Sequence, residues 1–532
     1  MDYTKLKALY ALGLKSVVRV IIYRLGVKFG FNPVKKLKAK IQEGNFFSMP
    51  DSIGSTDLTV NSQWNQQQCY FGWKIKKETT IPNWHKSVLT GVCVENPKRP
   101  WWGIKDFDSL LGDIKGVWEA SRFDWLICFA QQAAQGDQES LNKLNSWLCD
   151  WCVNNPPYRG INWKCGQESS MRVMHVAMAA IILEQYNRPS VPLLTFIKAH
   201  LKRILPTIGY AVGQDNNHGT SEAAALFIGG SWLVAAGDSS GEKYYDKGRF
   251  WLENRAVCLI EVDGSFSQYS TTYHRVMLDT YSMVAVWNYK LSLPKMSSTL
   301  YGKLAAATNW LYQIVQFESG DAPNLGANDG ARLIPLTNSS YRDFRQSVQL
   351  ASVLFCKKLA WLSDGSWNLP LKWLRVTSPA EALPKQSSFH FSHGGYLGLR
   401  GNRNDFVLLT YPCFKFRPSQ CDALHVDFWV DGVNLLRDGG TYSYNAGDKY
   451  INYYGSNRSH NTIQFDDRDQ MPRLSRFLLG DWLKAVNVNF DSILNTCQAS
   501  YIDNHGAKHR RFVAITRNSL QVEDEISGFE EH

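Results

Sequence analysis

The sequence lacks an apolar run long enough to cross a membrane. Near the N-terminus, the longest stretch without a charge is Ala8 to Leu14, between Lys7 and Lys15. A membrane-spanning helix needs about 20 apolar residues. The charges also interrupt any secretory signal, and no small-residue cleavage site follows. We therefore expect neither a transmembrane segment nor a signal peptide, which favours a cytoplasmic location.

The N-terminal region, residues 4–41, instead predicts one or two basic amphipathic helices. We expect these helices to be docked on the protein or solvated, with contact to a membrane surface as the alternative.

The sequence also has little of what zinc and nucleic-acid sites need. Its eleven cysteines include one close pair, Cys149 and Cys152, with no second pair or nearby histidines to complete a zinc site. The formal net charge of +10 favours anionic partners. The basic residues are dispersed rather than clustered, so we expect no nucleic-acid partner.

The composition is that of a large globular protein rich in aromatic residues. A length of 532 residues exceeds what one hydrophobic core usually supports, which predicts two large domains. Aromatic residues make up 13% of the chain and include 19 Trp. Such rings form the floor of sugar-binding clefts, but they also fill cores, and we expect most of them to be core.

The first half of the chain has a helical period. From about residue 105 to 370, apolar residues recur at helical spacing, as at Leu126, Phe129, Ala130 and Ala133. Helices that recur with short joints suggest antiparallel pairs stacked as a bundle, a solenoid or a closed toroid.

The period changes to two after a stretch rich in Pro, Ser and Lys at 363–388. Asp431-Gly432 is a strong hairpin turn between two short apolar runs, and an antiparallel sandwich is the expected class. The chain stops soon after the last predicted strand, so we expect a truncated C-terminus. The predicted strands lie near 397–399, 406–411, 424–430, 434–436, 460–465, 511–515 and 521–526.

Two polar motifs carry the candidate chemistry. Asn216, Asn217 and His218 precede an Ala-rich helical run, whose first unpaired N–H groups should attract an anion such as a carboxylate. Tyr273 follows in a segment rich in Ser and Thr. Abstraction of a proton beside a carboxylate requires a group that binds the carboxylate and a phenol that transfers the proton. The alternative is that the amides cap a helix and the tyrosine packs in the core.

Several motifs together resemble the heparinase II/III-like family of polysaccharide lyases, over roughly residues 95–530. The resemblance is closest to members found in bacterial surface-polysaccharide gene clusters. These motifs are Asp113-Ile-Lys-Gly-Val-Trp-Glu-Ala-Ser-Arg122, Gly160-Ile-Asn-Trp-Lys-Cys-Gly-Gln-Glu168 with Arg172, Asn216-Asn-His218, Tyr273, Asp422, Asp438-Gly-Gly-Thr-Tyr442 and Ser459-His-Asn-Thr-Ile463.

The resemblance implies an α+β multidomain protein with an N-terminal (α/α) toroid and a C-terminal antiparallel β-sandwich. We expect a lead-in at 1–94, the toroid at 95–370, a linker at 371–387 and the sandwich at 388–532. It also implies a periplasmic or cell-envelope location, in contrast to the cytoplasmic location that the missing signal peptide favours.

The reaction implied by the resemblance is β-elimination on a uronate-containing acidic polysaccharide. A base removes the proton on C5 and an acid protonates the leaving oxygen on C4, while the carboxylate is neutralised. Asn217 and His218 match the neutralising position, and Tyr273 matches the catalytic tyrosine. His460 is expected to reach the same cleft between the domains.

One motif departs from the family pattern. Where many members carry His-x-His-x-Asp, this chain has Pro418 and Gln420 in the histidine positions. Asp438 and His460 remain as possible metal ligands, but glutamine is a poor zinc ligand. We expect no cofactor, with a divalent metal as the alternative. His425 is close in sequence, but on a strand it would face away from Gln420 and is expected to be an ordinary histidine of the sheet.

Four further residues are candidates for substrate binding: Trp163, Glu168, Arg172 and Asn216. The alternatives are core packing for Trp163 and a simple ion pair between Glu168 and Arg172, one helical turn apart. A non-catalytic glycan-binding or polysaccharide-assembly protein is the alternative function. A glycoside hydrolase is weaker, since it needs two opposed carboxylates and only Glu168 and Glu222 are candidates. No pattern predicts an oligomeric state.

Overall fold

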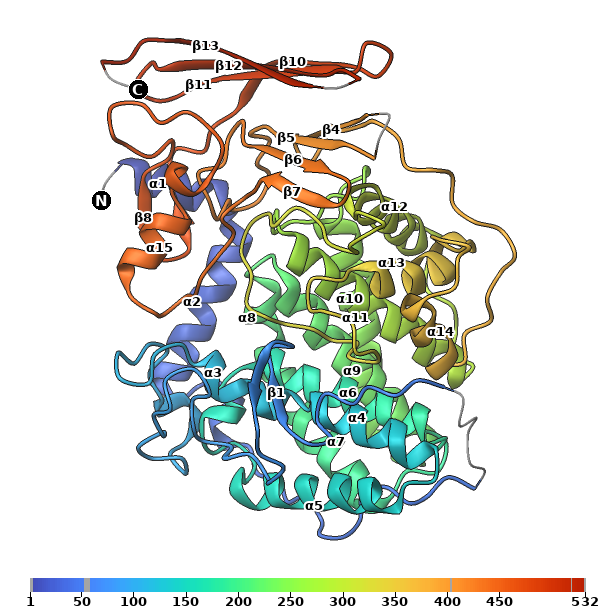
Figure 1. Cartoon of the computed structure of the whole chain (residues 1–532). Coiled ribbons are helices and arrows are strands. Elements are labelled where there is room, and N and C mark those ends of the chain that lie inside the picture. The colour runs from blue at the N-terminus through green and yellow to red at the C-terminus, as the bar shows by residue number, and fades with distance from the viewer. Residues whose placement is uncertain (1–2, 52–57, 402–403, 518, 531–532) are drawn as a thin grey trace.

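A computed structural model describes residues 3–51, 58–401, 404–517 and 519–530. It consists of a helical domain followed by antiparallel sheets, with both the N-terminal helices and the sheets beside the helical domain (Figure 1). This architecture confirms the predicted fold class. Within the described residues, no helix has the length and apolar character needed to cross a membrane.

The chain begins with two helices, α1 (Tyr3–Ala11) and α2 (Leu14–Phe29). Gly13 lies between them with φ 80°, a conformation that side chains rarely adopt, so the glycine allows the break. The segments 31–51 and 58–114 are mostly irregular, and the second contains the short hairpin of β1 (Gln68–Tyr70) and β2 (Lys74–Lys76).

The helical domain follows the period that the sequence predicts. Several of its longer helices begin at capping side chains: Ser190, Asn216, Ser270 and Ser297 each accept a hydrogen bond from a backbone N–H of the first turn. The helices are α3 (Lys115–Trp118), α4 (Asp124–Ala134), α5 (Gln138–Asn154), α6 (Gly166–Ile182), α7 (Val191–Ile204), α8 (Ile208–Val212), α9 (Asn217–Ala235), α10 (Glu242–Leu259), α11 (Thr271–Lys290), α12 (Ser298–Ile314), α13 (Arg345–Ala351) and α14 (Leu369–Trp373).

Two antiparallel sheets form the C-terminal domain. Their facing sides share one apolar core, which includes Leu399 and Val407 from the first sheet and Ala499 and Val513 from the second. The first sheet has the order β3 (Phe389–Phe391), β4 (Tyr396–Arg400), β5 (Phe406–Thr410), β6 (Val426–Val430) and β7 (Val433–Leu436). The second has the order β10 (Ala485–Asp491), β11 (Thr496–Ile502), β12 (Lys508–Ile515) and β13 (Leu520–Ser527).

The turn between β6 and β7 is the one that the sequence predicts. Asp431 and Gly432 have φ values of 48° and 77°, and two consecutive left-handed residues match the twist of the strands that they join. The predicted strand at His460–Phe465 is wrong. Asn461 in this segment donates its backbone N–H to the His425 side chain, so a side chain takes the place of a sheet partner.

The connection between the two sheets carries a short helix and a small hairpin beside the helical domain. These are α15 (Asp448–Tyr454), β8 (Arg473–Ser475) and β9 (Leu478–Leu479). Asp113 joins the two domains here, because its Oδ2 atom accepts hydrogen bonds from the Ser443 hydroxyl at 2.7 Å and the Tyr444 backbone N–H at 3.2 Å.

Close packing of α9 on α10 depends on two glycines. A Cβ atom on Gly248 would lie 2.3 Å from the backbone nitrogen of Phe227, and one on Gly230 would lie 2.3 Å from that of Tyr245. Neither neighbour is a flexible side chain, so the helices would have to separate.

We therefore predict that Gly248→Ala lowers the free energy of unfolding by about 1–3 kcal/mol, the usual cost of overpacking. The matched control is Gly302→Ala on α12, where a Cβ meets nothing within 4 Å. That change should raise stability by about 0.5–1 kcal/mol, because alanine favours a helix over glycine. Urea unfolding followed by helical circular dichroism measures both. Equal effects of the two changes would contradict the packing argument.

Candidate active site

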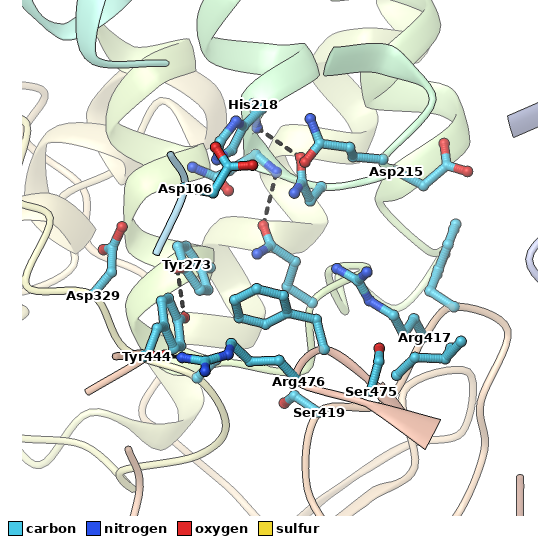
Figure 2. A pocket seen from close by; sticks show the side chains of 18 of the residues that line it. Asp106, Asp215, His218, Tyr273, Asp329, Arg417, Ser419, Tyr444, Ser475 and Arg476 are labelled. Atoms are coloured by element: carbon cyan, nitrogen blue, oxygen red, sulfur yellow. Dashed lines mark hydrogen bonds between the residues drawn. The ribbon is translucent and has the colours of Figure 1, made fainter. Parts of the chain in front are cut away.

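A large cavity lies where the N-terminal helices, the helical domain and the sheet domain meet (Figure 2). Its volume is about 1050 Å³, which is at the upper end of ordinary ligand sites. Three of the four predicted catalytic residues line it, namely Asn217, His218 and Tyr273. The fourth, His460, is not among the lining residues and lies in the sheet domain instead.

The first turn of α9 presents the side chain of Asn217 to the cavity. The Asn216 side chain accepts from the backbone N–H of His218 at 3.0 Å, and the Gln268 side chain accepts from that of Asn217 at 2.7 Å. These N–H groups already have partners, so the prediction that they attract an anion is wrong. The Asn217 Oδ1 atom is buried without a hydrogen-bond partner. Its side chain amide, rather than the helix terminus, is the group left to bind a ligand.

His218 is a half-buried imidazole on the same turn. Its ring has no hydrogen bond within the described part of the chain, which leaves both ring nitrogens for a ligand. Burial lowers the pKa of His218, and the opposing effect of Glu222 and Asp329 is smaller. The imidazole is therefore neutral at pH 7 and able to accept a proton.

Tyr273 lies in the first turn of α11, where the Ser270 hydroxyl accepts from its backbone N–H. Its phenol oxygen is 2.8 Å from that of Tyr444 (Figure 2). Burial raises the pKa of Tyr273 well above its usual value, and the negative charge of Asp329 adds to the shift. The group is therefore a protonated phenol at neutral pH.

Tyr444 is a site residue that the sequence reasoning missed. It lies in the irregular connection after β7, and the Lys115 ammonium is 3.4 Å from the centre of its ring. The signal available in the sequence was Thr441-Tyr-Ser-Tyr444, two tyrosines directly after the Asp438-Gly-Gly motif. Nothing local distinguishes Tyr444, which lines the cavity beside Tyr273, from Tyr442, which is mostly exposed.

A buried network of charges lies next to Tyr273 and Tyr444. Arg122 donates to both carboxylate oxygens of Glu168, at 2.9 and 2.8 Å, and its guanidinium is 3.8 Å from Asp329. Lys115 is 3.9 Å from the same Asp329 carboxylate. Burial alone would raise the pKa of Asp329, but Lys115 and Arg122 outweigh it and hold the pKa below its usual range. A fixed negative charge is thus kept near the two phenols.

Arg417 is the second residue that the sequence reasoning missed. It lines the cavity and has no hydrogen bond or ion pair among the described residues, although Tyr273, Tyr444 and Asp215 are close enough to affect its pKa. Burial lowers that pKa. The residue directly precedes Pro418, in the motif where the family carries histidine, so its position next to the departure was the available signal.

Two predicted substrate-binding residues lie outside the cavity. Trp163 is fully buried and packs against Trp151 and His200. Arg172 is also fully buried and donates to the His200 ring and to the Asn162 carbonyl oxygen. The prediction that these two contact substrate is wrong, because both side chains are fully buried among other protein groups and neither lines the cavity.

Glu168 and Asn216, the other two predicted substrate-binding residues, do line the cavity. Both already have protein partners: Glu168 binds Arg122 rather than Arg172, and Asn216 caps α9.

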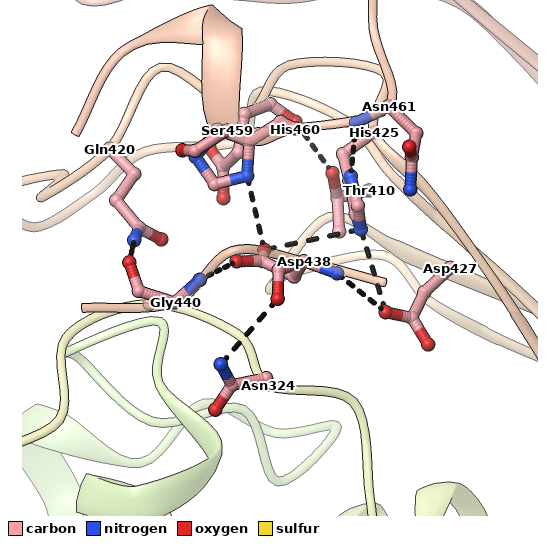
Figure 3. Close-up of polar contacts among 12 residues, drawn as sticks. Asn324, Thr410, Gln420, His425, Asp427, Asp438, Gly440, Ser459, His460 and Asn461 are labelled. Atoms are coloured by element: carbon pink, nitrogen blue, oxygen red, sulfur yellow. Dashed lines mark hydrogen bonds and ion pairs between the residues drawn. The ribbon is translucent and has the colours of Figure 1, made fainter. Parts of the chain in front are cut away.

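The candidate metal ligands form a separate cluster in the sheet domain (Figure 3). Asp438 Oδ2 is 3.3 Å from His460 Nδ1 and 4.0 Å from His425 Nε2, and all three residues are buried. His425 was expected to be an ordinary sheet histidine facing away. The segment between β5 and β6 is irregular rather than a strand, so alternation of side chains does not apply to it.

The donor set of this cluster does not fit a metal. His425 Nδ1 accepts the Asn461 backbone N–H at 2.9 Å, so in the neutral ring the proton resides on Nε2, the atom that faces Asp438. A protonated nitrogen cannot bind a cation. Gln420 points its amide at the Gly440 and Tyr454 carbonyl oxygens. Asp438 and His460 are then the two ligands left, fewer than the three or four of ordinary zinc sites.

We therefore predict that the protein, purified in the presence of zinc and then dialysed, holds far less than one equivalent of metal by mass spectrometry. A chelator should leave its thermal unfolding midpoint unchanged. Gln420→His is the informative variant, because it restores a histidine to the family position. Stoichiometric zinc in the unmodified protein, with a fall in the midpoint on chelation, would show that the Asn461–His425 hydrogen bond gives way to a metal.

Comparison with known proteins agrees with this architecture. Residues 383–532 match the family model described as heparinase II/III-like, C-terminal. A structure of heparinase III is 15% identical, with a TM-score of 0.58, over 96% of this chain and 78% of that chain. The BT4657 gene product, also a heparinase III, is 16% identical, with a TM-score of 0.53, over 99% and 79%.

A mutant of the heparan sulfate lyase HepC from Pedobacter heparinus is 17% identical, with a TM-score of 0.50, over 94% of this chain and 73% of that chain. A search of curated proteins finds no match. Identities this low establish a shared fold. The resemblance to the heparinase II/III-like family is thus confirmed by the family model for residues 383–532, and the solved structures share the fold of the chain as a whole.

Proposed function

We propose that this protein is a polysaccharide lyase that cleaves a uronate-containing acidic polysaccharide by β-elimination. The observation that carries the proposal is the meeting of Asn217, His218 and Tyr273 in one cavity, each with a functional group left without a fixed role in the fold. A cavity of about 1050 Å³ has room for several sugar rings.

The charge of the cavity supports an acidic substrate. Most of its acidic side chains are held by protein cations, as Asp215 is by Arg255 at 2.8 Å. Among its basic side chains, Arg24 and Arg417 have no carboxylate or hydrogen-bond partner in the described parts of the chain. Unpaired cations in a partly desolvated site bind carboxylates and sulfates strongly, because the surrounding protein screens the charge less than water does.

Tyr273 is assigned as the general acid. Its raised pKa means that the phenol enters the reaction with its proton, and Tyr444 at 2.8 Å orients the hydroxyl. The phenol donates this proton to O4 as the C4–O4 bond breaks. Tyr273 as both acid and base would require a phenolate in the resting enzyme, which the same pKa shift opposes.

His218 is assigned as the general base. The neutral imidazole takes the proton from C5, and the electron pair of the C5–H bond forms the C4=C5 double bond while the pair of the C4–O4 bond leaves with O4. His218 then carries the proton from C5 and Tyr273 is a phenolate, and transfer of one proton from His218 to Tyr273 through solvent restores both groups. The elimination requires no oxidant and no further reactant.

Asn217 and Arg417 are assigned to the substrate carboxylate. Charge on this group grows as C5 loses its proton, so donors that meet it stabilise the transition state more than the bound substrate. The Nδ2 amide of Asn217, which has no hydrogen-bond partner in the described part of the chain, is the donor that would meet the carboxylate, and Arg417 is a cation without a partner. Arg417 lies next to Pro418 in the chain and supplies a positive group where the family motif has a histidine.

Tyr273→Phe should lower kcat by about 10²–10⁴-fold, the usual contribution of a general acid, while the fold remains intact. Tyr442→Phe is the matched control: it removes a hydroxyl from another tyrosine of the cavity that has no assigned role. The assay is the ultraviolet absorbance of unsaturated uronate products, run against a panel of acidic polysaccharides. An active enzyme that is indifferent to Tyr273→Phe would overturn the mechanism.

Arg417→Gln should raise KM and also lower kcat, for a fall in kcat/KM of about 10²-fold, since it removes a charge-assisted contact of about 2–3 kcal/mol. Arg417→Lys should recover part of the loss, and Arg437→Gln, an exposed cation outside the cavity, should have no effect. The salt dependence of KM should also weaken in Arg417→Gln. A KM unaffected by Arg417→Gln would remove this residue from the site.

The second candidate function is a glycan-binding or polysaccharide-assembly protein that does not cleave. Pro418 and Gln420 favour it, because they replace two histidines of the family motif. Saturable binding of an acidic polysaccharide to the same cavity, without ultraviolet product and without new reducing ends, would select this function. Reducing ends without the ultraviolet signal would select hydrolysis.

A further inference from the structure

Helix α2 carries an apolar stripe that no other part of the described protein covers. Leu14, Val18, Ile22, Leu25 and Phe29 recur at spacings of three and four residues, so they share one face of the helix. Their side chains are between 42% and 78% exposed. Soluble surfaces carry single exposed apolar residues, but a stripe along four turns of one helix marks an interaction surface.

The opposite side of α2 is fixed to the helical domain. The Tyr23 ring stacks on Tyr210 with 4.1 Å between centroids, the Arg19 guanidinium lies 5.3 Å from the Trp251 ring, and the Ser16 hydroxyl donates to Asp215 at 2.8 Å. The helix is therefore held in place at the margin of the molecule (Figure 1), and the side chains of the stripe are exposed on its other side.

The charge around the stripe has one sign. Residues 3–42 contain ten Lys and Arg and no Asp or Glu, so this segment alone equals the net charge of +10 of the whole chain. The sequence-based expectation of dispersed basic residues is corrected in this respect. Lys15 and Lys28 are exposed beside the stripe, and Tyr10 and Phe31 extend the exposed apolar surface beyond both ends of α2.

We propose that α1 and α2 form a docking surface for an anionic lipid membrane. Apolar side chains in a row, flanked by lysines and free of acidic residues, are the arrangement by which a helix lies in the headgroup region with its apolar face in the acyl boundary. The charge decides between occupants: a second copy of this basic surface would repel the first, whereas anionic headgroups attract it.

The proposal places the cavity at the membrane. Leu12, Val17, Val20 and Arg24, on the side of the N-terminal helices away from the stripe, line the cavity wall. A glycan attached to or lying on the lipid surface would then be presented to the cavity without diffusing from bulk solution. Membrane docking does not depend on the lyase activity, because the stripe and the catalytic side chains share no residue.

The experiment is co-sedimentation of the full-length protein with vesicles of phosphatidylcholine alone and with vesicles of phosphatidylcholine and phosphatidylglycerol in equal amounts. We expect binding to the anionic vesicles and little to the neutral ones. Binding should weaken between about 0.15 M and 1 M salt, where the screening length falls from about 8 Å to about 3 Å.

Two variants separate the apolar and the charged contributions. The triple change Leu14→Ser, Ile22→Ser and Phe29→Ser should weaken binding by about tenfold per residue. The double change Lys15→Gln and Lys28→Gln should weaken it by about fivefold per charge. These side chains are exposed and outside the cavity, so folding, read by circular dichroism, should be unchanged.

The matched control removes two exposed apolar side chains elsewhere. Ile493→Ser with Leu494→Ser, in the turn between β10 and β11, should leave vesicle binding as it was. Equal binding to neutral and anionic vesicles, no binding at low salt, or binding unaffected by the triple change would each overturn the proposal. So would a concentration-dependent dimer in analytical ultracentrifugation that the triple change abolishes, which would assign the stripe to self-association.

Discussion

The buried guanidinium of Arg122 is the contact on which the arrangement of the site depends. The guanidinium donates two hydrogen bonds to Glu168 of α6, and it lies 3.2 Å from Glu119 and 3.8 Å from Asp329. The backbone carbonyl oxygen of Arg122 contacts the His175 ring. Burial lowers the pKa of Arg122, but these carboxylates outweigh burial and hold the pKa well above its usual value. Removing this cation would leave its partners as uncompensated charges in the interior, which proteins tolerate poorly.

The network also sets the charge of the site. Burial raises the pKa of Glu119 to about 8, so this carboxyl is protonated at neutral pH. Arg122 and Lys115 then face Glu168 and Asp329, two cations against two anions. Burial is the largest cause of both pKa shifts: it raises the pKa of Tyr273, to which Asp329 adds, and lowers the pKa of His218, which Glu222 and Asp329 oppose. One buried environment thus holds a phenol with its proton and an imidazole without one, as an acid and a base require.

Part of this site could be predicted from the sequence because the signal was local. Asn217, His218 and Tyr273 are polar residues at helix starts, and a helix start fixes where its first side chains point. Arg172 was misjudged for the opposite reason. A polar residue on a helix usually marks an exposed face, but α6 is buried on all sides and its arginine is satisfied by partners from other segments.

The residues that were missed lie on irregular segments between strands. Arg417 and Tyr444 reach the cavity because the chain bends there, and no period describes a bend. His425 and His460 lie close together for the same reason. The backbone N–H of Asn461, in the loop that follows His460, donates to the His425 ring. The architecture itself followed from the change of period, since helices and strands must each bury a face at their own spacing.

The contact between α1 and the loop that follows β9 has a consequence for the order in which the protein folds during synthesis. The Thr4 hydroxyl donates to Asp481, 477 residues away, and Lys7 lies 3.8 Å from the same carboxylate. During synthesis α1 and α2 emerge before the sheet domain, and their contacts with it cannot form until the residues up to Asp481 have followed. A partial product that ends before the first sheet would contain Asn217, His218 and Tyr273 but not Arg417 or Tyr444, so the cavity would lack the wall that the sheet domain supplies. The cavity would therefore be complete only when the loop that carries Asp481 meets α1.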